Sequence, residues 1–325
     1  MIVFRFTHED LLRTRFAIGP LCELMWSVAV LREPEAHGIH LPWVRAARRR
    51  LDGLPLDLLH ALGSRGPSGY VPDFPAPPPT SPLPDLAGEL ARVRATPPAQ
   101  VRRELGWRFG GTVVPDCVRP LLDDPGRGLP ALTELMAVYW ERAIAPWWPA
   151  IRTALEDDVR HRAARLTASG TGEVFAGLHP QVRWAGGALV VDRPAEQELE
   201  LSGRGLLLVP ACFAWPDVFA MTDAPWQPAL IYAPVGIGEL WAPSPPPDPG
   251  ALAALLGARR AAVLVALARP QGTGSLAAAL ALPASSVSEH VGILRRAGLV
   301  RSVRDGRAVT HERTPAGDAV ALGGA

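Results

Sequence analysis

Residues 242–250, APSPPPDPG, divide the 325-residue chain into two parts. Proline fixes the backbone angle φ and has no N–H to donate, so a run of this kind cannot continue a helix or occupy a central strand. Such a segment is typical of a semi-rigid polyproline linker. Because the chain is also longer than one average domain, we expect an N-terminal body at residues 1–241, a linker at 242–250 and a C-terminal domain at residues 251–325.

The two parts differ in charge. All 33 basic residues of the chain are Arg, and with 32 acidic residues the net charge is +1. From position 257 onward there are nine Arg and four acidic residues, a net charge of +5, whereas the 24 Arg and 28 acidic residues before it give −4. A small basic domain on a mildly acidic body is typical of a nucleic-acid-binding module attached to another function.

Missing residue types and motifs exclude several kinds of chemistry. The chain has no Lys, which excludes a P-loop lysine and a Schiff-base lysine. Three Cys residues lie far apart, and their odd number argues against a disulfide framework or a structural zinc site; they are Cys22, Cys117 and Cys212. No GxSxG, HExxH or GxGxxG motif is present. We therefore expect no enzyme activity, no catalytic residues, no cofactor and no bound metal.

The distribution of apolar residues along the chain indicates the cellular compartment of the protein. The opening MIVFRFTHEDLLRTRF is charged within five residues and lacks the apolar core of a signal peptide. The most apolar helical segment, residues 251–268, is interrupted by Arg259 and Arg260, so no run reaches the roughly 18 apolar residues of a membrane span. These features predict a cytoplasmic protein without a membrane segment.

The first part of the body has helical periodicity. A short β-prone run at residues 2–6 precedes Thr7, a candidate N-cap for a helix through Phe16. Further helices are expected before Pro34, after Pro42, and over residues 85–108 and 129–167.

The pattern changes after Gly170. Short apolar runs bounded by Gly and Pro predict strands at residues 182–184, 188–191, 199–201, 206–209 and 230–232. The proline-rich residues 66–84 are interpreted as a long surface loop. We therefore predict an α+β fold in which a mostly helical body with a small β-sheet near its end is joined by the linker to the C-terminal domain.

Two features of the body have more than one interpretation. His37 and His40 form an HxxH pair that could hold a metal on a helix, but Gly38 and Pro42 favour a loop. All ten Trp residues precede Ala242. They either pack in the core or line an apolar pocket for a small-molecule effector.

The C-terminal domain begins with helical stretches at residues 249–256 and 258–268. Ser275 is expected to cap a short helix at residues 276–281, and Pro283 ends this segment. A longer helix is expected at residues 286–297. Two short helices joined in this way predict a helix-turn-helix.

Helix 286–297 has two different faces. Ser286 and Glu289 have the spacing of a capping box at its start, and the apolar residues Val287, Val291 and Leu294 predict a buried face. The opposite face is polar and predicts a DNA-reading surface in the major groove. It consists of Ser285, Ser288, Glu289, Gly292, Arg295 and Arg296.

The composition of this helix limits how it could read bases. It has no Asn or Gln, so the common bidentate contact to adenine is unavailable. Ser285, Ser288 and His290 remain for base edges, and the two Arg residues suit phosphates. Glu289 either caps the helix or accepts a hydrogen bond from cytosine. His290 either packs or touches a phosphate, or it contacts a base edge.

After Gly298, an expected C-cap, residues 300–311 predict a β-hairpin wing. Asp305-Gly306 is a strong hairpin-turn signal, because both central residues of that turn have positive φ. The turn would place Arg304 beside Arg307, where paired Arg side chains can bind phosphate or enter the minor groove. Thr314-Pro315 then begins a last helix, expected to pack on a partner or on the body. The residues predicted to contact DNA are Ser285, Ser286, Ser288, Glu289, His290, Arg295, Arg296, Arg301, Arg304 and Arg307.

The stretch SSVSEHVGILRRAGLVRSVRDGRAVTHERT resembles the recognition helix and wing of ArsR-type winged helix-turn-helix regulators. The matching positions are Ser288, His290, Val291, Leu294, Ala297, Gly298, Leu299, Val300, Arg304, Gly306 and Arg307. The opening FRFTHEDLLRTRFAIGPLCELMWS makes the rest similar to a long N-terminal domain of unknown function that precedes the winged helix in some of these regulators. The resemblance implies DNA binding and a homodimer. Metal-sensing members carry a Cys pair where this chain has LAAALAL, so the resemblance does not extend to metal sensing.

Together these features predict a transcriptional regulator, expected to be a repressor, that binds double-stranded operator DNA. Helix 286–297 and wing 300–311 would read the DNA, and a small-molecule effector in the N-terminal body would control it. The alternative is a small-molecule-binding protein or an enzyme whose winged helix mediates protein–protein contacts.

Overall fold

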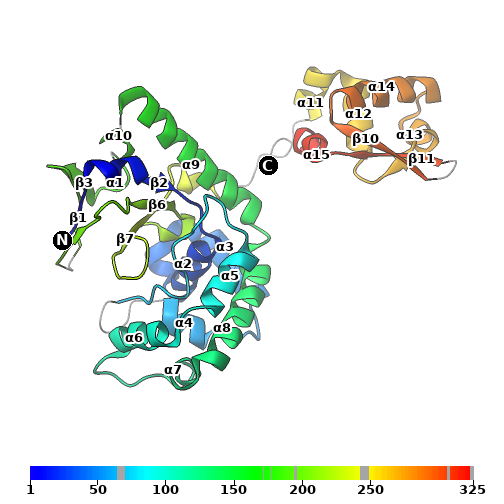
Figure 1. Ribbon diagram of the computed structural model, residues 1–325. Helices are drawn as coiled ribbons and strands as arrows, with labels where there is room; N and C mark the ends of the chain where they lie inside the picture. The colour runs from blue at the N-terminus through cyan, green and yellow to red at the C-terminus, as the bar shows by residue number, and fades with distance from the viewer. Residues whose placement is uncertain are drawn as a thin grey trace. The chain divides into compact units, whose positions relative to one another are not determined.

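The computed structural model describes residues 1–63, 70–170, 172–175, 177–193, 196–241, 249–305 and 308–322. The chain forms two compact units (Figure 1), an N-terminal unit, Met1–Trp241, and a C-terminal unit, Ala242–Ala325. Each unit contains both helices and strands, so the fold is α+β, as predicted. Residues 242–248 of the predicted linker lie outside the described residues, and Pro249 already begins helix α11 (Pro249–Leu256).

Two four-stranded sheets are described in the N-terminal unit. The first has the order β3-β4-β1-β5, with β1 antiparallel to β4 and parallel to β5. The second has the order β2-β6-β8-β7, in which β6 is parallel to both its neighbours and β7 is antiparallel to β8. The strands are β1 (Ile2–Arg5), β2 (Arg15–Phe16), β3 (Val182–Ala185), β4 (Ala188–Val191), β5 (Gln197–Glu200), β6 (Leu207–Pro210), β7 (Val218–Met221) and β8 (Ala229–Tyr232).

The prediction of one small sheet near the end of the body was wrong. The predicted strands exist near their expected positions, but β7 was missed and the strands divide between two sheets. Each sheet also takes a strand from the start of the chain, because β1 lies between β4 and β5 and β2 lies beside β6. Pairing between segments so far apart leaves no local periodicity in the sequence.

Most helices of the N-terminal unit lie in the predicted segments, but α4, α7 and α10 were not predicted. In Figure 1 α4, α6 and α7 gather at the end of the unit away from β1 and β3. Thr7 caps the first helix as predicted, with the Asp10 amide donating to Thr7 Oγ1 at 3.2 Å. That helix ends at Arg13 instead of Phe16, because Arg15 and Phe16 form β2. The helices are α1 (His8–Arg13), α2 (Pro20–Arg32), α3 (Leu41–Arg50), α4 (Asp57–Gly63), α5 (Leu86–Arg94), α6 (Pro98–Phe109), α7 (Arg119–Asp123), α8 (Pro125–Tyr139), α9 (Trp148–Ser169) and α10 (Gly172–Phe175), with a π-turn, Trp140–Ile144, after α8.

Helix α2 lies in the main hydrophobic core, where most of its residues are buried. A helix that is apolar on nearly all sides is typical of a core position. Glu23 is a buried exception, and its carboxylate accepts from the amides of Cys212 at 2.6 Å and Phe213 at 3.1 Å. These amides begin the 3₁₀-helix Cys212–Ala214, so Glu23 caps it from another element. Burial raises the pKa of Glu23 to about 7.

The proline-rich segment is only in part the surface loop that its composition predicted, because residues 80–83 are exposed but the residues before them are mostly buried. Residues 64–69 lie outside the described residues, but most of residues 72–79 are buried, and Phe74 is 0% exposed. The Glu104 carboxylate on α6 accepts from the amides of Asp73 and Phe74, each at 2.8 Å. A side chain therefore provides the partners that regular secondary structure would otherwise give to this buried backbone.

A buried ion pair lies within α9, and Tyr232 on the second sheet hydrogen-bonds to its carboxylate. Arg162 Nε donates to Asp158 Oδ2 at 2.9 Å, and the two side chains are 2% and 0% exposed. The Tyr232 hydroxyl on β8 donates to the same carboxylate oxygen at 2.7 Å, and the Val235 amide donates to Oδ1 at 3.0 Å. Asp158 thus accepts from three donors deep in the unit.

His37 and His40 do not share a site. His37 Nδ1 donates to the Trp215 carbonyl at 2.8 Å, whereas His40 Nδ1 accepts from Trp241 Nε1 at 2.9 Å. Throughout the described residues no group of three or more potential metal ligands occurs. His40 instead accepts a hydrogen bond from Trp241, the last residue of the N-terminal unit.

We expect the titration of His40 to decrease the stability of the N-terminal unit in acid, a contribution opposite in sign to that of Glu23. Burial, with a smaller contribution from His37, lowers the pKa of His40 from 6.5 to about 3. The folded state therefore favours the neutral imidazole, so this stabilisation is complete above pH 6.5 and decreases as the pH falls from 6.5 toward 3. Between pH 6.5 and 5 the loss should be about 2 kcal/mol.

Urea unfolding followed by Trp fluorescence would measure this loss. His40→Gln can still accept from Trp241 but does not titrate, so acidification from pH 6.5 to 5 should lower the stability of the native protein by about 2 kcal/mol relative to that of His40→Gln. Parallel losses of stability in the native protein and in His40→Gln would contradict the assignment.

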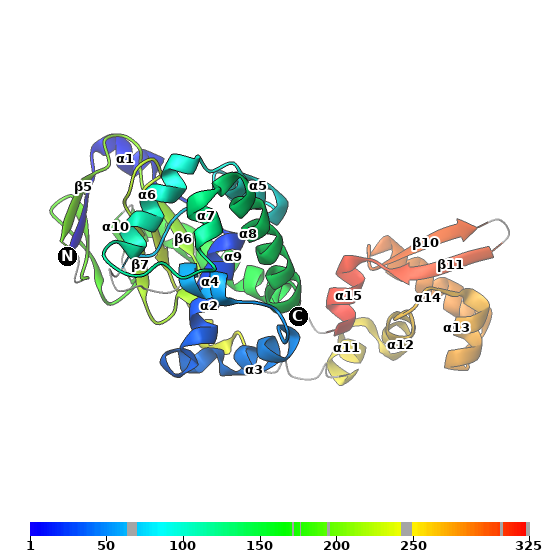
Figure 2. The same ribbon diagram turned by 90° about the horizontal axis from the view of Figure 1, so that it is seen from below.

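The C-terminal unit has a three-stranded sheet of order β10-β11-β9 beside a group of helices. Its core consists of Val263, Leu264, Leu267, Leu276, Val287, Val291, Leu294, Val300 and Ala321. Figure 2 shows the β10–β11 hairpin extending past the helices. The last helix packs on α12 and β11 of its own unit, which corrects the expectation that it packs on a partner or on the body. The elements after α11 are α12 (Ala258–Ala266), β9 (Gln271–Gly272), α13 (Thr273–Leu280), α14 (Ala284–Arg296), β10 (Val300–Asp305), β11 (Ala308–Arg313) and α15 (Pro315–Leu322).

Within the described part of the chain, no single helix is long and apolar enough to cross a membrane. The pair α13 and α14 passes by length and composition only when its two bent members are taken together.

Candidate nucleic-acid interface

Helices α13 and α14 turn through 112° across a short connection. Ala281 ends α13 in the left-handed region, with φ of 51°, and Pro283 precedes α14. The predicted cap at Ser275 was wrong, because α13 begins two residues earlier, at Thr273, after Gly272 as N-cap. Two helices at 90–120° joined by three or four residues have the geometry of a helix-turn-helix.

The predicted capping box at the start of α14 was also wrong. The helix begins at Ala284 with Pro283 as N-cap, and no side chain caps it. The first helical hydrogen bond runs from the Val287 amide to the Pro283 carbonyl at 3.1 Å. Pro283 has the extended ψ of 139° that an N-cap needs, so the helix starts before Ser286. Ser286 and Glu289 therefore lie inside the helix.

The two faces of α14 are those expected from its sequence. Val287, Val291 and Leu294 are buried. Successive residues of a helix are rotated by roughly 100°, which places the polar set on the opposite side. Its members Ser285, Ser288, Glu289, Arg295 and Arg296 are all exposed.

Ser286 and His290 lie at the margin of this exposed face. Both are partly buried, and both ring nitrogens of His290 are buried without a hydrogen-bond partner among the described residues. His290 therefore does not present a ring nitrogen on the exposed face of α14. Of the two interpretations of His290, this geometry favours packing.

The end of α14 is fixed by two backbone hydrogen bonds around Gly298, as its sequence predicts. The Leu299 amide donates to the Leu294 carbonyl at 2.9 Å, and the Gly298 amide donates to the Arg295 carbonyl at 3.0 Å. Gly298 has a φ of 73°, the left-handed conformation that ends a helix in a Schellman motif. Arg295 and Arg296 thus occupy the last turn, beside the negative end of the helix dipole.

Strands β10 and β11, over the predicted wing, form an antiparallel hairpin, but the predicted turn was one residue too early. Asp305 pairs with Ala308 and so belongs to the strand. Gly306 and Arg307 lie outside the described residues, and with them the predicted pairing of Arg304 and Arg307 at the tip.

Arg301 and Arg304 lie on opposite faces of the hairpin, because side chains alternate along a strand. Arg301 stands opposite Glu312 and forms an ion pair with it at 2.6 Å. Arg304 is exposed, beyond the buried Val300 on the same face. The structure therefore does not combine Arg301 and Arg304 into one patch.

A polar cluster that the sequence did not reveal joins the β10–β11 hairpin to α13. His311 on β11 is 7% exposed, with Nε2 3.0 Å from Thr273 Oγ1 and Nδ1 2.9 Å from Ser302 Oγ. Burial and the nearby Arg295 charge lower the pKa of His311. The cluster ties the first residue of α13 to both long strands, with the Arg295 end of α14 close by. Alternation along β11 could have flagged His311 as inward-facing, but nothing local identifies its partners.

Comparison with known proteins adds one finding. A family model described as a family of unknown function (DUF5937) matches residues 109–237. The matched segment contains β3 to β8 but neither β1 nor any part of the C-terminal unit. No curated protein and no solved structure matches the chain.

Proposed function

We propose that the C-terminal unit is a winged helix-turn-helix that binds double-stranded DNA, and that the protein is a cytoplasmic transcriptional regulator, most simply a repressor. The observation that carries the proposal is the exposed face of α14. Two Ser hydroxyls, a carboxylate and two Arg side chains point outward on a helix that turns through 112° from the one before it. A recognition helix presents such a face to the major groove.

The contacts follow from the chemistry of each side chain. Ser285 and Ser288 can exchange hydrogen bonds with base edges, and Glu289, which caps no helix, can accept from the amino group of cytosine. Arg295 and Arg296 suit phosphates at the groove edge, and Arg304 and Arg307 suit the backbone or minor groove beside the hairpin.

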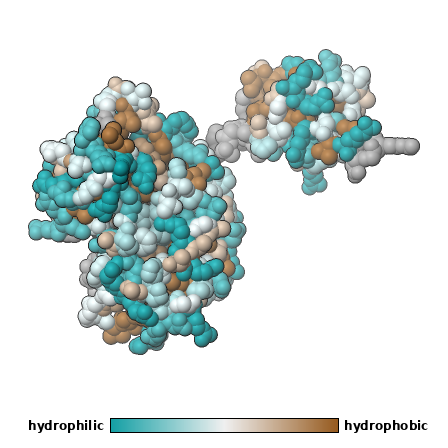
Figure 3. Space-filling view, in the orientation of Figure 1, coloured by the Kyte–Doolittle hydropathy of each residue, from teal (hydrophilic) through white to brown (hydrophobic). Residues whose placement is uncertain are grey.

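A homodimer is part of the proposal, since two-fold DNA sites match two-fold proteins. Helix α11 offers a surface for it, because Leu255 is 74% exposed on a helix whose other residues are mostly apolar. Figure 3 shows hydrophobic residues gathered over α11, whereas hydrophilic residues cover much of the rest of the visible face of this unit. Exposed apolar surface of this kind marks interaction sites.

The salt dependence of DNA binding tests the proposal. Binding sites would be selected from a random-sequence duplex library, and affinities measured by fluorescence anisotropy at several salt concentrations. Replacing both Arg295 and Arg296 by Ala should weaken binding about 10- to 100-fold and reduce the slope of log K against log salt by about 2, because two phosphate contacts are lost.

A matched control exists in the N-terminal unit. Arg49 and Arg50 are likewise adjacent, exposed and in the last turn of a helix, α3. The Arg49→Ala, Arg50→Ala variant should keep both affinity and salt slope. An Arg295→Ala, Arg296→Ala protein that also keeps them would overturn the proposed docking of α14.

Base reading can be separated from phosphate binding with Ser288→Ala. Ser288 is exposed in the middle of the polar face, so its loss should relax the preference at one base pair by about 1–3 kcal/mol without changing the salt slope. Repeating the library selection with this variant measures the effect. An unchanged base preference at every position would show that Ser288 does not read bases.

A further inference from the structure

The N-terminal unit contains a cavity of about 580 Å³ between α2, the segment after residue 70 and strand β7. This volume lies within the range of pockets that hold small molecules. Its walls come from parts of the chain far apart in sequence, including Met25 and Trp26 on α2 and Phe219 and Met221 on β7.

The apolar wall of the cavity is aromatic. The rings of Trp26 and Phe219 are stacked, with centroids 3.6 Å apart and planes at 19°. Arg193 lies against the same Phe219 ring, with Cζ 5.4 Å from the centroid. The parts of these rings that are not covered by the stacking line the cavity as an apolar surface.

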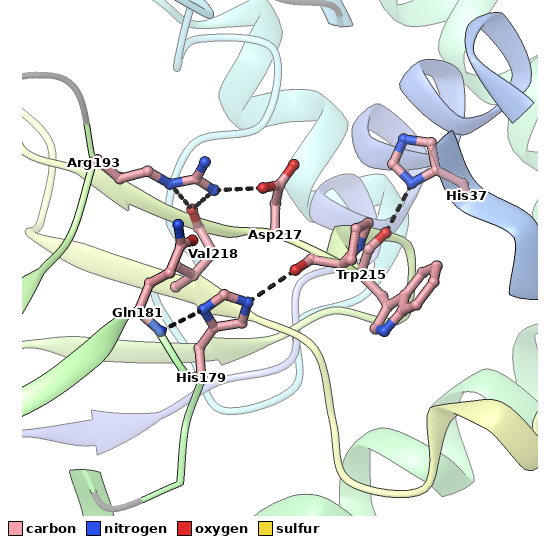
Figure 4. Close-up of polar contacts among 8 residues, drawn as sticks. His37, His179, Gln181, Arg193, Trp215, Asp217 and Val218 are labelled. Carbon is pink, nitrogen blue, oxygen red and sulfur yellow. Dashed lines mark hydrogen bonds and ion pairs between the residues drawn. The ribbon is translucent and has the colours of Figure 1, made fainter. Parts of the chain in front are cut away.

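Residues 215–217 lead into strand β7. The side chains of His37, His179 and Arg193 hydrogen-bond to this segment and to Val218 (Figure 4). His37 Nδ1 donates to the Trp215 carbonyl and His179 Nε2 to the Pro216 carbonyl, both at 2.8 Å. Arg193 Nε donates to the Val218 carbonyl, and Arg193 Nη2 to Asp217 Oδ1, each at 3.0 Å.

These hydrogen bonds have two consequences for the cavity. A wall fixed in advance loses little freedom when a ligand binds. The charge of Arg193 is also already committed to Asp217, so Arg193 is not free to attract an anion.

The polar end of the cavity is acidic. Asp73 and Asp223 both line it, and the Oδ2 atom of Asp73 is buried without a hydrogen-bond partner among the described residues. Burial raises the pKa of both carboxyls. The Glu104 and Asp223 charges raise the pKa of Asp73 further, whereas the Arg103 charge lowers that of Asp223. A carboxylate in this setting is stabilised most by a cation that brings its own N–H donors.

The neighbouring polar groups do not supply that cation to Asp73, whereas the Arg103 charge acts on Asp223. The Glu104 carboxylate is occupied by the amides of Asp73 and Phe74 and by Trp226 Nε1 at 2.8 Å. Arg103 donates to Gln100 and, at 3.1 Å, to the Ala224 carbonyl.

We propose that this cavity binds a largely apolar molecule with one protonated amine, the amine meeting Asp73 and Asp223 and the apolar part lying along Trp26 and Phe219. A carboxylate beside aromatic rings is a general arrangement for recognising an ammonium group. The proposal concerns ligand binding by the N-terminal unit and does not rest on DNA binding.

Three indoles of similar size and different charge test the ligand class by isothermal titration calorimetry with the full chain. They are tryptamine, a cation, 3-ethylindole, which is neutral, and indole-3-propionate, an anion. Tryptamine should bind at least about 10-fold more tightly than 3-ethylindole, as expected for a charge-assisted hydrogen bond. Indole-3-propionate should bind most weakly. Equal affinities, preference for the anion, or no binding of any of the three would overturn the proposal.

Two variants locate the amine. Asp73→Asn and Asp223→Asn should each reduce the preference for tryptamine over 3-ethylindole, while the affinity for 3-ethylindole changes little. Asp52→Asn removes an exposed carboxylate outside the cavity and should leave the preference intact. If both cavity variants retain the preference of the native protein, the amine does not bind at these carboxylates. No DNA is present in this experiment, so its failure leaves the DNA-binding proposal untouched.

Discussion

Replacing Asp158 by Ala should lower the free energy of unfolding of the N-terminal unit by about 3–5 kcal/mol, the usual cost of leaving one charge of a buried ion pair without its partner. Arg162, 2% exposed, would keep its charge and lose its counter-ion. The Tyr232 hydroxyl and the Val235 amide would each lose an acceptor as well. Urea unfolding followed by Trp fluorescence reports this unit alone, because all ten Trp residues precede Ala242.

The neighbouring Asp157 provides the control. Its side chain is 53% exposed and pairs with the exposed Arg160 on the same helix, so Asp157→Ala should change stability by less than about 1 kcal/mol. Adding Arg162→Leu to Asp158→Ala removes the unpaired cation and should restore part of the loss. If Asp158→Ala were no more destabilising than Asp157→Ala, the buried pair would not hold α9 to the sheet.

Replacing Gly317 by Ala should destabilise the C-terminal unit by about 3 kcal/mol, at the upper end of the usual cost of overpacking. A Cβ at this position would lie 1.9 Å from the Leu299 carbonyl oxygen and 2.9 Å from its carbonyl carbon. Both obstacles are backbone, so no side-chain rotation can relieve the clash. Helix α15 would have to move away from the junction between α14 and β10.

Two spectroscopic signals identify the unit that unfolds. Gly317→Ala should lower the temperature at which part of the far-ultraviolet circular dichroism is lost, while the Trp fluorescence transition stays in place. Gly274→Ala makes the same change in α13, where a Cβ meets nothing within 4 Å, and should be neutral or slightly stabilising. An identical circular dichroism transition for Gly317→Ala and the native protein would refute the close approach of α15 to Leu299.

Sequence reasoning recovered the elements that local signals specify. Val287, Val291 and Leu294 predicted the buried face of α14, and Gly298 predicted its end. The predicted helix boundaries that were wrong lie where two local sequence signals compete. Ser286 and Glu289 have capping-box spacing, but Pro283 supplies the N-cap conformation three residues earlier.

Features made by distant segments could not be predicted in this way. The buried path of the proline-rich segment depends on Glu104, whose carboxylate accepts from the Asp73 and Phe74 amides. The cavity is formed by residues as distant as Trp26, Asp73 and Phe219. Apolar periodicity records whether a side chain is buried, but it does not record which other segment buries it.

The place of β1 in its sheet affects how the protein folds while it is being made. Ile2 pairs with Val191 on one side and with Gln197 on the other, so this strand leaves the ribosome long before either partner exists. At roughly 5–20 residues per second, it waits roughly 10 to 40 seconds with its apolar side chains unpaired. The segment 109–237, made alone, would contain β4 and β5 but not the strand between them. Translation order therefore leaves the first strand of this sheet without partners until the other three strands of the sheet have been made, and chaperones that bind emerging apolar segments have that interval in which to act.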